Sequence, residues 1–409
     1  MSLAVKRSIL FVIDDINYES GMRQAVITQI NALQRDYEIT LFSTTALKNK
    51  DIHVENNVKI VSASGFIKEK PYLLHSVRKV IVGRYPLLHK IRSIVFFFLK
   101  TMKLHENVIS HFINDITKEQ FETYDNVVVL SENSIFRKYV SMLKNPKKIQ
   151  WLHTDYERWR NFNIWTKFLT RSDCKLYQKF DAIVSVSEKC KEGFVREFPQ
   201  LEEKAIVIRN LVQTDTIRQL AKMNCPEVKI STDCFNIVTI GRFSPEKNHK
   251  GLLYMAWKLK QSSVHFRWFF VGDGELAQTI KIIRNRMGLE DTVVMLGYLK
   301  NPYPVLLKMD LMVLFSLYEA TPITIDESMV LGVPVMSKQI GGIAEQIQNG
   351  KNGILVNGNE NEGFEVIKKL IEDKKTLMQI RENLSEMDFC RTDDINKLNK
   401  LFMKDVNYD

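Results

Sequence analysis

The sequence lacks several features that mark particular classes of protein. Its 409 residues contain no run of 18 or more apolar residues, so we expect no membrane-spanning helix. Its five cysteines form no Cys-x-x-Cys pair, which argues against a zinc site or a disulfide framework. No strand-like segment ends in an isolated Asp-x-Asp, the pattern of a chelating metal site, and Asp14-Asp15 lacks that spacing. We therefore expect a cytoplasmic protein with no metal and no cofactor.

What the sequence does contain is two series of strand-like segments separated by helical patterns. Segments rich in Val, Ile, Leu and Phe that alternate with helices are typical of doubly wound α/β domains with parallel sheets. The first series comprises Ser8–Ile13, Glu38–Ser43, Val58–Ala63, Val127–Leu130, Ile149–Leu152, Ala182–Val186 and Ala205–Ile208. The second comprises Ile237–Ile240, Trp268–Val271, Val293–Leu296, Met312–Phe315, Val333–Met336 and Ile354–Val356.

The length and the polar stretch between the two series predict two Rossmann-like domains. We place the N-terminal domain at 1–215, a linker at 216–234 and the C-terminal domain at 235–385. Residues 386–409 are predicted to form a helical tail that crosses back to the N-terminal domain.

Charged residues follow the first strand of the second series. The strand leads into Gly241-Arg242-Phe243-Ser244-Pro245-Glu246-Lys247. Ligands of open parallel sheets bind beyond the carboxyl ends of the strands, so Arg242 and Lys247 can converge on an anion. Arg binds bidentately and Lys acts as a point charge, a pair suited to a diphosphate. Taken alone, the motif is also compatible with ordinary loop cations.

Two further strand ends carry glycine or acidic residues. Gly272 and Gly274 follow Trp268–Val271 and would permit close approach of a ligand. After Met312–Phe315 come Glu319 and then Pro322, which favours the start of a helix.

The predicted helix after Pro322 supplies an anion site and a second acid. Thr321, Ile323 and Thr324 stand at its beginning, where free backbone N–H groups bind anions. Glu327 lies one turn further on, where a carboxylate can accept hydrogen bonds from the hydroxyls of a ribose. The alternative for Glu327 is a solvated acid on the helix surface. Gly341-Gly342 follows the next strand and is also compatible with a simple tight turn.

Together these residues resemble glycosyltransferase family 4, which has the GT-B fold. The matches are Gly241-Arg242 with Lys247, Gly272-Asp273-Gly274, Glu319-x7-Glu327, Gly332-Val333-Pro334 and Gly341-Gly342, in the family's order. The N-terminal half is less similar: Trp151-Leu152-His153 resembles the strand end that carries the family's acceptor-cleft histidine. The resemblance implies two Rossmann-like domains that face a central cleft.

The resemblance also implies roles for individual residues. Arg242 and Lys247 would neutralise the diphosphate as the sugar leaves, Glu319 would contact sugar hydroxyls, and His153 would orient the sugar or the acceptor. Glu327 would bind the ribose of a nucleotide sugar, expected to be UDP-linked, which is a substrate and not a cofactor. Three positions depart from the family pattern. Of the usual Gly-Gly pair in the first loop only Gly21 is present, while Ala320 and Asn248 stand where glycine is common.

A basic segment in the N-terminal half accounts for much of the net charge of +10. Lys68–His105 contains nine Lys and Arg residues against one acid. A helix over Leu87–Lys103 would gather Leu, Ile and Val on one arc and Lys90, Arg92, Lys100 and Lys103 on the other, beside Phe96 and Phe97. This pattern favours contact with an anionic membrane surface, and packing of the helix on its own sheet is the alternative. No nucleic-acid-binding module is recognisable.

The resemblance thus implies a retaining glycosyltransferase that acts in bacterial surface polysaccharide biosynthesis, with a lipid-linked glycan as the expected acceptor. The two cations and the lack of an Asp-x-Asp predict that it is metal-independent. We expect it in the cytoplasm, peripheral on the inner face of the plasma membrane. A sugar phosphorylase or a transferase with a soluble acceptor is an alternative enzyme. A catalytically silent GT-B subunit that binds nucleotide sugar or scaffolds a membrane complex is an alternative of another class.

Overall fold

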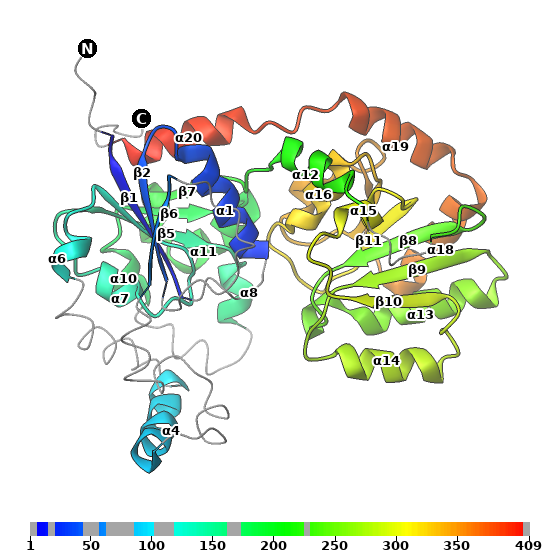
Figure 1. Cartoon of the computed structure of the whole chain (residues 1–409), viewed down its shortest axis with the longest axis horizontal. Coiled ribbons are helices and arrows are strands. Elements are labelled where there is room, and N and C mark those ends of the chain that lie inside the picture. Colours follow the sequence, from blue (N-terminus) through cyan, green and yellow to red (C-terminus); the bar gives the residue numbers. More distant parts are fainter. Residues whose placement is uncertain are drawn as a thin grey trace. The chain divides into compact units, whose positions relative to one another are not determined.

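The computed structural model describes residues 6–14, 21–43, 57–62, 86–101, 118–161, 173–224 and 230–403. The chain divides into two compact units (Figure 1). Unit 1 comprises Met1–Leu211 with Thr392–Asp409, and unit 2 comprises Val212–Arg391.

Unit 1 is built on a seven-stranded sheet whose pairs are all parallel. The strand order is β3-β2-β1-β4-β5-β6-β7. The strands are β1 (Ser8–Ile13), β2 (Glu38–Ser43), β3 (Lys59–Ser62), β4 (Asn126–Val129), β5 (Lys147–Leu152), β6 (Ala182–Ser185) and β7 (Ala205–Val207). The described helices are α1 (Gly21–Leu33), α4 (Leu87–Thr101), α6 (Lys118–Phe121), α7 (Arg137–Val140), α8 (Tyr156–Arg160), α10 (Asp173–Tyr177), α11 (Glu188–Glu197), η2 (Pro199–Lys204) and α20 (Thr392–Phe402).

Unit 2 is built on a six-stranded parallel sheet of order β10-β9-β8-β11-β12-β13. The strands are β8 (Phe235–Ile240), β9 (Phe266–Val271), β10 (Val293–Gly297), β11 (Leu311–Leu314), β12 (Val335–Lys338) and β13 (Ile354–Val356). The helices are α12 (Thr214–Ala221), η3 (Pro245–Lys247), α13 (His249–Gln261), α14 (Ala277–Arg286), α15 (Tyr303–Leu306), α16 (Ile323–Val330), α17 (Ile343–Gln346), α18 (Glu360–Glu372) and α19 (Lys375–Glu386).

Both sheets have the hydrophobic pattern of parallel sheets covered on two faces. In unit 2 every residue of β8 and β11 is buried, and in unit 1 every residue of β4 is buried. These strands are therefore largely apolar in sequence, with Asn126, Asn236 and Thr239 as buried exceptions, which is why the sequence predicted them. The expected class, two Rossmann-like α/β domains, is confirmed.

The strand order of each sheet fixes where a ligand can bind. In unit 2 the chain moves outward from β8 through β9 to β10, and then returns to the other side of β8 with β11. Right-handed crossovers then place α13 and α14 on one face of the sheet and α16 on the other (Figure 1). In an open α/β sheet, ligands bind outside the carboxyl ends of the strands at such a reversal, which here lies between β8 and β11. The corresponding reversal in unit 1 lies between β1 and β4.

The C-terminal helix α20 belongs to unit 1 although its sequence follows unit 2. Phe402 packs edge-on against Phe11 and Tyr37, with ring centroids 6.2 and 5.8 Å apart. Nζ of Lys147 donates a 2.6 Å hydrogen bond to the carbonyl of Leu401 in the last turn, where a cation complements the helix dipole. The tail thus completes the core of unit 1 beside β1 and β2 (Figure 1).

The segment predicted as a linker differs from the expectation. Residues 214–221 form α12, which packs against α15 and α16 and is part of unit 2. Ile217 and Ala221 are buried in the core of unit 2, and this apolar pair supplies the physical reason. Along the sequence, the boundaries of the units therefore fall after Leu211 and after Arg391, not at 215 and 385.

No described helix is both long and apolar enough to cross a membrane. Helix α4 confirms the predicted helix from Leu87 to Thr101, and the last two residues of the prediction, Met102 and Lys103, lie outside the described residues. Its apolar residues Leu87, Leu88, Ile91, Ile94 and Val95 are 42 to 73% exposed, so they do not pack on the sheet of unit 1. The side chains of Phe96 to Lys100, with Lys68–Tyr85 and Met102–His105, lie outside the described residues.

Candidate active site

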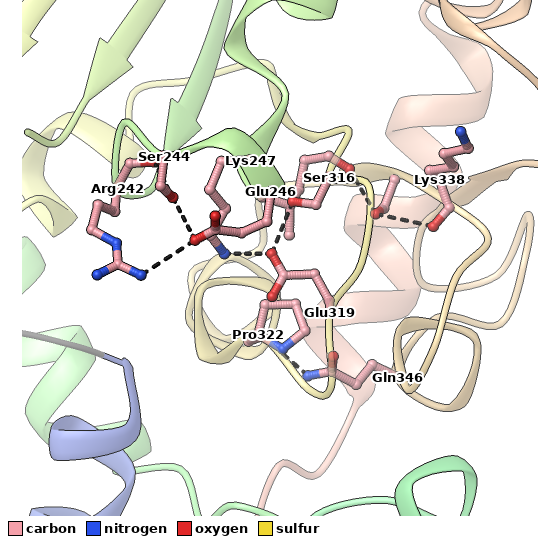
Figure 2. A network of polar contacts seen from close by, with 11 residues as sticks. Arg242, Ser244, Glu246, Lys247, Ser316, Glu319, Pro322, Lys338 and Gln346 are labelled. Atoms are coloured by element: carbon pink, nitrogen blue, oxygen red, sulfur yellow. Dashed lines mark hydrogen bonds and ion pairs between the residues drawn. The ribbon is translucent and has the colours of Figure 1, made fainter. Parts of the chain in front are cut away.

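The loop after β8 carries the two cations that the sequence singles out. Arg242 is the second residue after the strand, and its Nη2 contacts Oε1 of Glu246 at 3.2 Å. Pro245–Lys247 forms a single turn of 3-10 helix, which turns the Lys247 side chain toward the loop that follows β11. There Nζ of Lys247 forms an ion pair with Glu319 (Figure 2). Each cation thus pairs with a carboxylate at the carboxyl-end edge of the sheet.

Asn248 shows why glycine is not required after Lys247. Its backbone is left-handed, with φ of 54°, a conformation that asparagine tolerates better than most residues. Its side chain caps α13 by accepting the N–H of Gly251, and its Nδ2 donates to the carbonyl of Phe315 at 3.2 Å. The backbone N–H of Leu317 donates to the carbonyl of Glu246 at 2.8 Å. The loops after β8 and β11 are therefore held together independently of their charged side chains.

The neighbouring backbone leaves no room for a side chain at Gly272 or Gly274. A Cβ atom on Gly272 would lie 2.0 Å from the carbonyl oxygen of Gly241, and one on Gly274 would lie 2.6 Å from that of Phe243. The two loops are also joined by hydrogen bonds, since Phe243 N donates to Asp273 O and Leu276 N to Phe243 O, both at 2.9 Å. The close approach predicted at these glycines is therefore made by the Gly241–Phe243 loop itself.

The acidic loop after β11 is fixed on two sides. Ser316, the second residue after the strand, donates a 2.8 Å hydrogen bond to Oε1 of Glu319. On the other side, a Cβ atom on Gly341 would lie 2.0 Å from the carbonyl oxygen of Glu319, and one on Gly342 would lie 2.0 Å from that of Ala320. The Gly-Gly pair is therefore more than a tight turn, because it lets the loop after β12 lie directly against the backbone that carries Glu319.

Helix α16 begins at Ile323, directly after Pro322. Neither backbone N–H of Ile323 and Thr324 has a hydrogen-bond partner among the described residues, as expected for the first turn of a helix. Gln346 contacts the same turn by donating to the carbonyl of Pro322 at 3.2 Å (Figure 2). The start of α16 can therefore bind an anion beside the Lys247–Glu319 pair.

Glu327 is a buried acid on α16, and the alternative of a solvated surface residue is excluded. Its side chain accepts a 2.7 Å hydrogen bond from the hydroxyl of Tyr303. Burial raises the pKa of Glu327 to about 7, and the Tyr303 hydrogen bond opposes this rise. Asp326 faces elsewhere, in an ion pair of 2.8 Å with Arg391. A carboxyl group that is buried away from water is costly to ionise. Buried carboxyl groups with a raised pKa are typical of functional sites.

His153 lies in unit 1, directly after β5. Its backbone N–H donates to Glu132 at 3.2 Å, and the Thr154 hydroxyl also donates to that carboxylate. Burial lowers the pKa of His153 to about 4, so the imidazole is neutral at physiological pH. Its Nε2 is buried and contacts no polar group among the described residues. A neutral imidazole can exchange a hydrogen bond with a hydroxyl there.

The remaining residues singled out in unit 1 have different surroundings. Gly21 is the exposed first residue of α1, and a Cβ atom there would meet nothing within 4 Å. Asp14, at the end of β1, accepts hydrogen bonds from the Ser134 hydroxyl at 2.6 Å and the Ile135 N–H at 3.2 Å. This carboxylate therefore fixes the loop after β4. Among the described residues, no three His, Cys, Asp or Glu side chains are grouped as metal ligands.

The motif order seen in the sequence corresponds to a family of known proteins. Residues 226–387 match the family model described as glycosyl transferases group 1. This part of unit 2 is therefore similar to a group 1 glycosyltransferase domain and is called the group 1 domain below.

Individual relatives match over part of their length. The N-acetylgalactosamine-N,N'-diacetylbacillosaminyl-diphospho-undecaprenol 4-alpha-N-acetylgalactosaminyltransferase of Campylobacter jejuni is 28% identical over 53% of this chain and 57% of its own. The UDP-Gal:alpha-D-GlcNAc-diphosphoundecaprenol alpha-1,3-galactosyltransferase of Escherichia coli is 29% identical over 53% of this chain and 56% of its own. The chain thus spans about half the length of these curated relatives.

Solved structures match nearly the whole fold. The crystal structure of Anabaena HepE in complex with UDP and glucose has a TM-score of 0.68 and 16% sequence identity. The match covers 96% of this chain and 98% of that one. The fold of the chain is therefore that of a GT-B protein.

The group 1 domain contains Arg242, Lys247, Glu319 and Glu327, whereas His153 and Gly21 precede it. Within the domain the structure brings Lys247, Glu319 and the start of α16 together, and it places Glu327 deeper on the same helix. Sequence reasoning missed Ser316, Tyr303 and Glu132. Ser316 could have been noticed because it follows a strand end, whereas Tyr303 and Glu132 are revealed only by their tertiary contacts.

Proposed function

We propose that the protein transfers a sugar from a UDP-linked donor to a glycan acceptor, with retention of configuration and without a metal ion. The observation that carries this proposal is the arrangement of Lys247, Glu319 and the first turn of α16 at one edge of a group 1 domain, next to Arg242. Cations and unpaired N–H groups together suit a diphosphate, and a carboxylate suits the hydroxyls of a sugar.

The cations act on the charge that develops as the donor is cleaved. When the bond between the anomeric carbon and the phosphate oxygen breaks, its electron pair stays on the diphosphate. Positioned cations stabilise such a charge strongly because they need no reorganisation during the reaction. Arg242 and Lys247 pair with Glu246 and Glu319 in the structure, and the bound diphosphate would replace these carboxylates as their partner. Glu319 would then accept hydrogen bonds from the sugar.

Retention is the stereochemistry that the family resemblance implies. The acceptor oxygen bonds to the anomeric carbon on the face from which the diphosphate departs, and the acceptor proton passes to the departing phosphate oxygen. This displacement requires no nucleophile from the protein. Glu319 and His153 are therefore assigned to positioning, and the neutral imidazole of His153 exchanges a hydrogen bond with a hydroxyl of the sugar or the acceptor.

The acceptor that we propose is a lipid-linked glycan of a bacterial surface polysaccharide. Two relatives, from Campylobacter jejuni and Escherichia coli, are named for acceptors in which a sugar is joined to undecaprenol through a diphosphate. Such an acceptor resides at a membrane. This supports a peripheral location of the protein on the cytoplasmic face of that membrane.

Replacement of Glu327 tests the donor site. Glu327→Ala is expected to weaken the binding of UDP at least about tenfold, because the buried carboxylate would no longer accept hydrogen bonds from the ribose hydroxyls. Isothermal calorimetry with UDP measures this directly. Glu345→Ala, which removes a partly exposed acid of α17, is the control and should leave the affinity unchanged. Equal affinities for wild type and Glu327→Ala would contradict the assignment of the ribose to Glu327.

We also propose that α4 docks unit 1 on an anionic bilayer. Leu87, Leu88, Ile91 and Val95 are at least half exposed, and no described strand or helix packs extensively against α4. Lys90 and Arg92 lie on the same helix, and no acidic residue occurs within it. An apolar arc beside cations is complementary to a bilayer surface that carries anionic headgroups.

Vesicle co-sedimentation tests this docking. Strong binding to vesicles of phosphatidylglycerol and weak binding to those of phosphatidylcholine are expected, because each basic residue near an anionic surface contributes about 1 kcal/mol. Replacing Lys90, Arg92, Lys100 and Lys103 with Gln should abolish most of the binding, and Leu88→Ser with Ile91→Ser should remove the part that resists salt.

The control for these variants is Lys281→Gln with Arg286→Gln, which removes two exposed cations from α14 in unit 2. It should bind vesicles as the wild type does. Equal sedimentation with both lipids would contradict the proposal, as would none with either. Self-association through α4, detected by sedimentation velocity without lipid, would assign the surface to a second copy instead.

A further inference from the structure

Tyr303 is the first residue of α15 and directs its hydroxyl at α16. Its side chain is 8% exposed, and that of its partner Glu327 is 7% exposed. The hydroxyl donates a 2.7 Å hydrogen bond to Oε1 of Glu327. Among the described residues, Tyr303 is the one side chain that hydrogen bonds to this carboxylate. No hydrogen bond to Oε2 is made by the residues that the structure describes.

We propose that Tyr303 is a positioning residue for the donor nucleotide, because its hydroxyl fixes Oε1 of Glu327 and so presents Oε2 to the ribose. The inference rests on the proposed function, in which Glu327 binds the ribose of UDP. Tyr303 itself does not contact the nucleotide in this account. It acts through the orientation and the ionisation of its neighbour.

The pKa of Glu327 lies near neutral pH, and the hydrogen bond from Tyr303 affects this pKa. Burial raises the pKa of this carboxyl to about 7, the Tyr303 hydrogen bond lowers it, and Asp326 raises it. The hydroxyl therefore favours the ionised form, which accepts hydrogen bonds from the ribose at both lone pairs of Oε2. Without it, the pKa would rise further and a larger share of Glu327 would be protonated at neutral pH.

Other titratable groups near Glu327 are few and are positioned differently. Asp326, its neighbour on α16, is held by Arg391. Helix α12 packs on α16 and carries Asp215 and Arg218, both exposed, while Lys338 ends β12 and Glu345 lies on α17. Of these groups only Asp326 influences the pKa of Glu327 appreciably. A pH dependence that changes with Tyr303 can therefore be attributed to the Tyr303–Glu327 pair.

The test is UDP calorimetry with Tyr303→Phe between about pH 6 and about pH 9, a range that covers the ionisation of Glu327. We expect the variant to bind UDP about tenfold more weakly than the wild type near pH 7. The deficit should shrink toward the alkaline end, where Glu327 ionises even without the hydroxyl. The ionisation of UDP itself is common to both proteins and cancels in the comparison. Recovery with pH separates the proposed role from a general loss of packing.

Three further variants make the outcome decisive. Tyr254→Phe removes a hydroxyl that donates to Asn361 on the exposed side of α13, and it should bind UDP normally. Glu327→Gln keeps an acceptor for Tyr303 but cannot ionise, so its UDP affinity should be low at every pH. Normal affinity of Tyr303→Phe at all pH values, with weak binding by Glu327→Ala, would overturn this inference and leave the proposed function intact. Normal affinity of Glu327→Ala would overturn the proposed ribose site itself.

Discussion

Lys247→Ala is expected to lower the rate of donor cleavage by at least about 100-fold, the usual effect of removing one group that stabilises charge in a transition state. Lys247 is the cation that the structure holds beside Glu319 and the first turn of α16, where the diphosphate would lie. The ion pair is partly buried, and without Lys247 the one described side chain that still hydrogen bonds to Glu319 is Ser316. The rate is measured as the release of nucleoside diphosphate from a saturating nucleotide sugar.

A matched control separates charge at the site from charge elsewhere. Lys258→Ala removes a lysine of α13 that hydrogen bonds to Asn361 on the surface, and its rate should equal that of the wild type. Thermal unfolding should show that both variants are folded at the assay temperature, so that a lower rate reports on the site and not on unfolding. A rate within threefold of the wild type for folded Lys247→Ala would remove this lysine from the diphosphate site.

Gly341→Ala is expected to abolish most of the activity without touching a charged residue. The new Cβ atom would lie 2.0 Å from the carbonyl oxygen of Glu319, and the backbone of Gly341 has φ of +49°. The loop after β12 and the acidic loop must therefore move apart, and this movement displaces Glu319. A displacement of about 1 Å in a catalytic site can lower a rate by about 100-fold. The same release assay detects the loss.

Gly350→Ala provides the control for backbone strain. Gly350 has φ of +78°, yet a Cβ atom there would meet nothing within 4 Å. Both substitutions place alanine in a left-handed conformation, at a cost of about 1 kcal/mol in stability. Only Gly341→Ala creates a clash with the site. Similar activities of the two variants would show that the contact between Gly341 and Glu319 does not position the acid.

The fold could be predicted because buried parallel strands carry a continuous apolar pattern. Each of the thirteen strands among the described residues overlaps a segment expected from the sequence. Some strands begin or end at other residues than the sequence predicted. Strand β12, for example, begins after Pro334, because proline cannot donate a backbone hydrogen bond to the sheet. Helix α12 was missed as an element because its eight residues present only a short apolar face, with Ile217 and Ala221 buried.

The charged part of the candidate site could also be predicted, since Arg242, Lys247 and Glu319 all follow strand ends. The roles of the glycines could not. Sequence alone shows that Gly272 and Gly341 can accommodate close approach, but the approaching group, another loop of the same domain, is visible only in three dimensions. Tyr303 was missed for a similar reason, because its partner Glu327 lies 24 residues further along the chain and no local pattern joins them.

Release of UDP from a panel of UDP-sugars in the presence of excess EDTA tests whether Arg242 and Lys247 act in place of a metal ion. Wild-type protein should cleave at least one UDP-sugar at the same rate with EDTA as with Mg²⁺, because Arg242 and Lys247 supply the positive charge. Arg242→Ala and Lys247→Ala should each be strongly impaired under both conditions. Cleavage that stops in EDTA and returns with Mg²⁺ or Mn²⁺ would contradict the account.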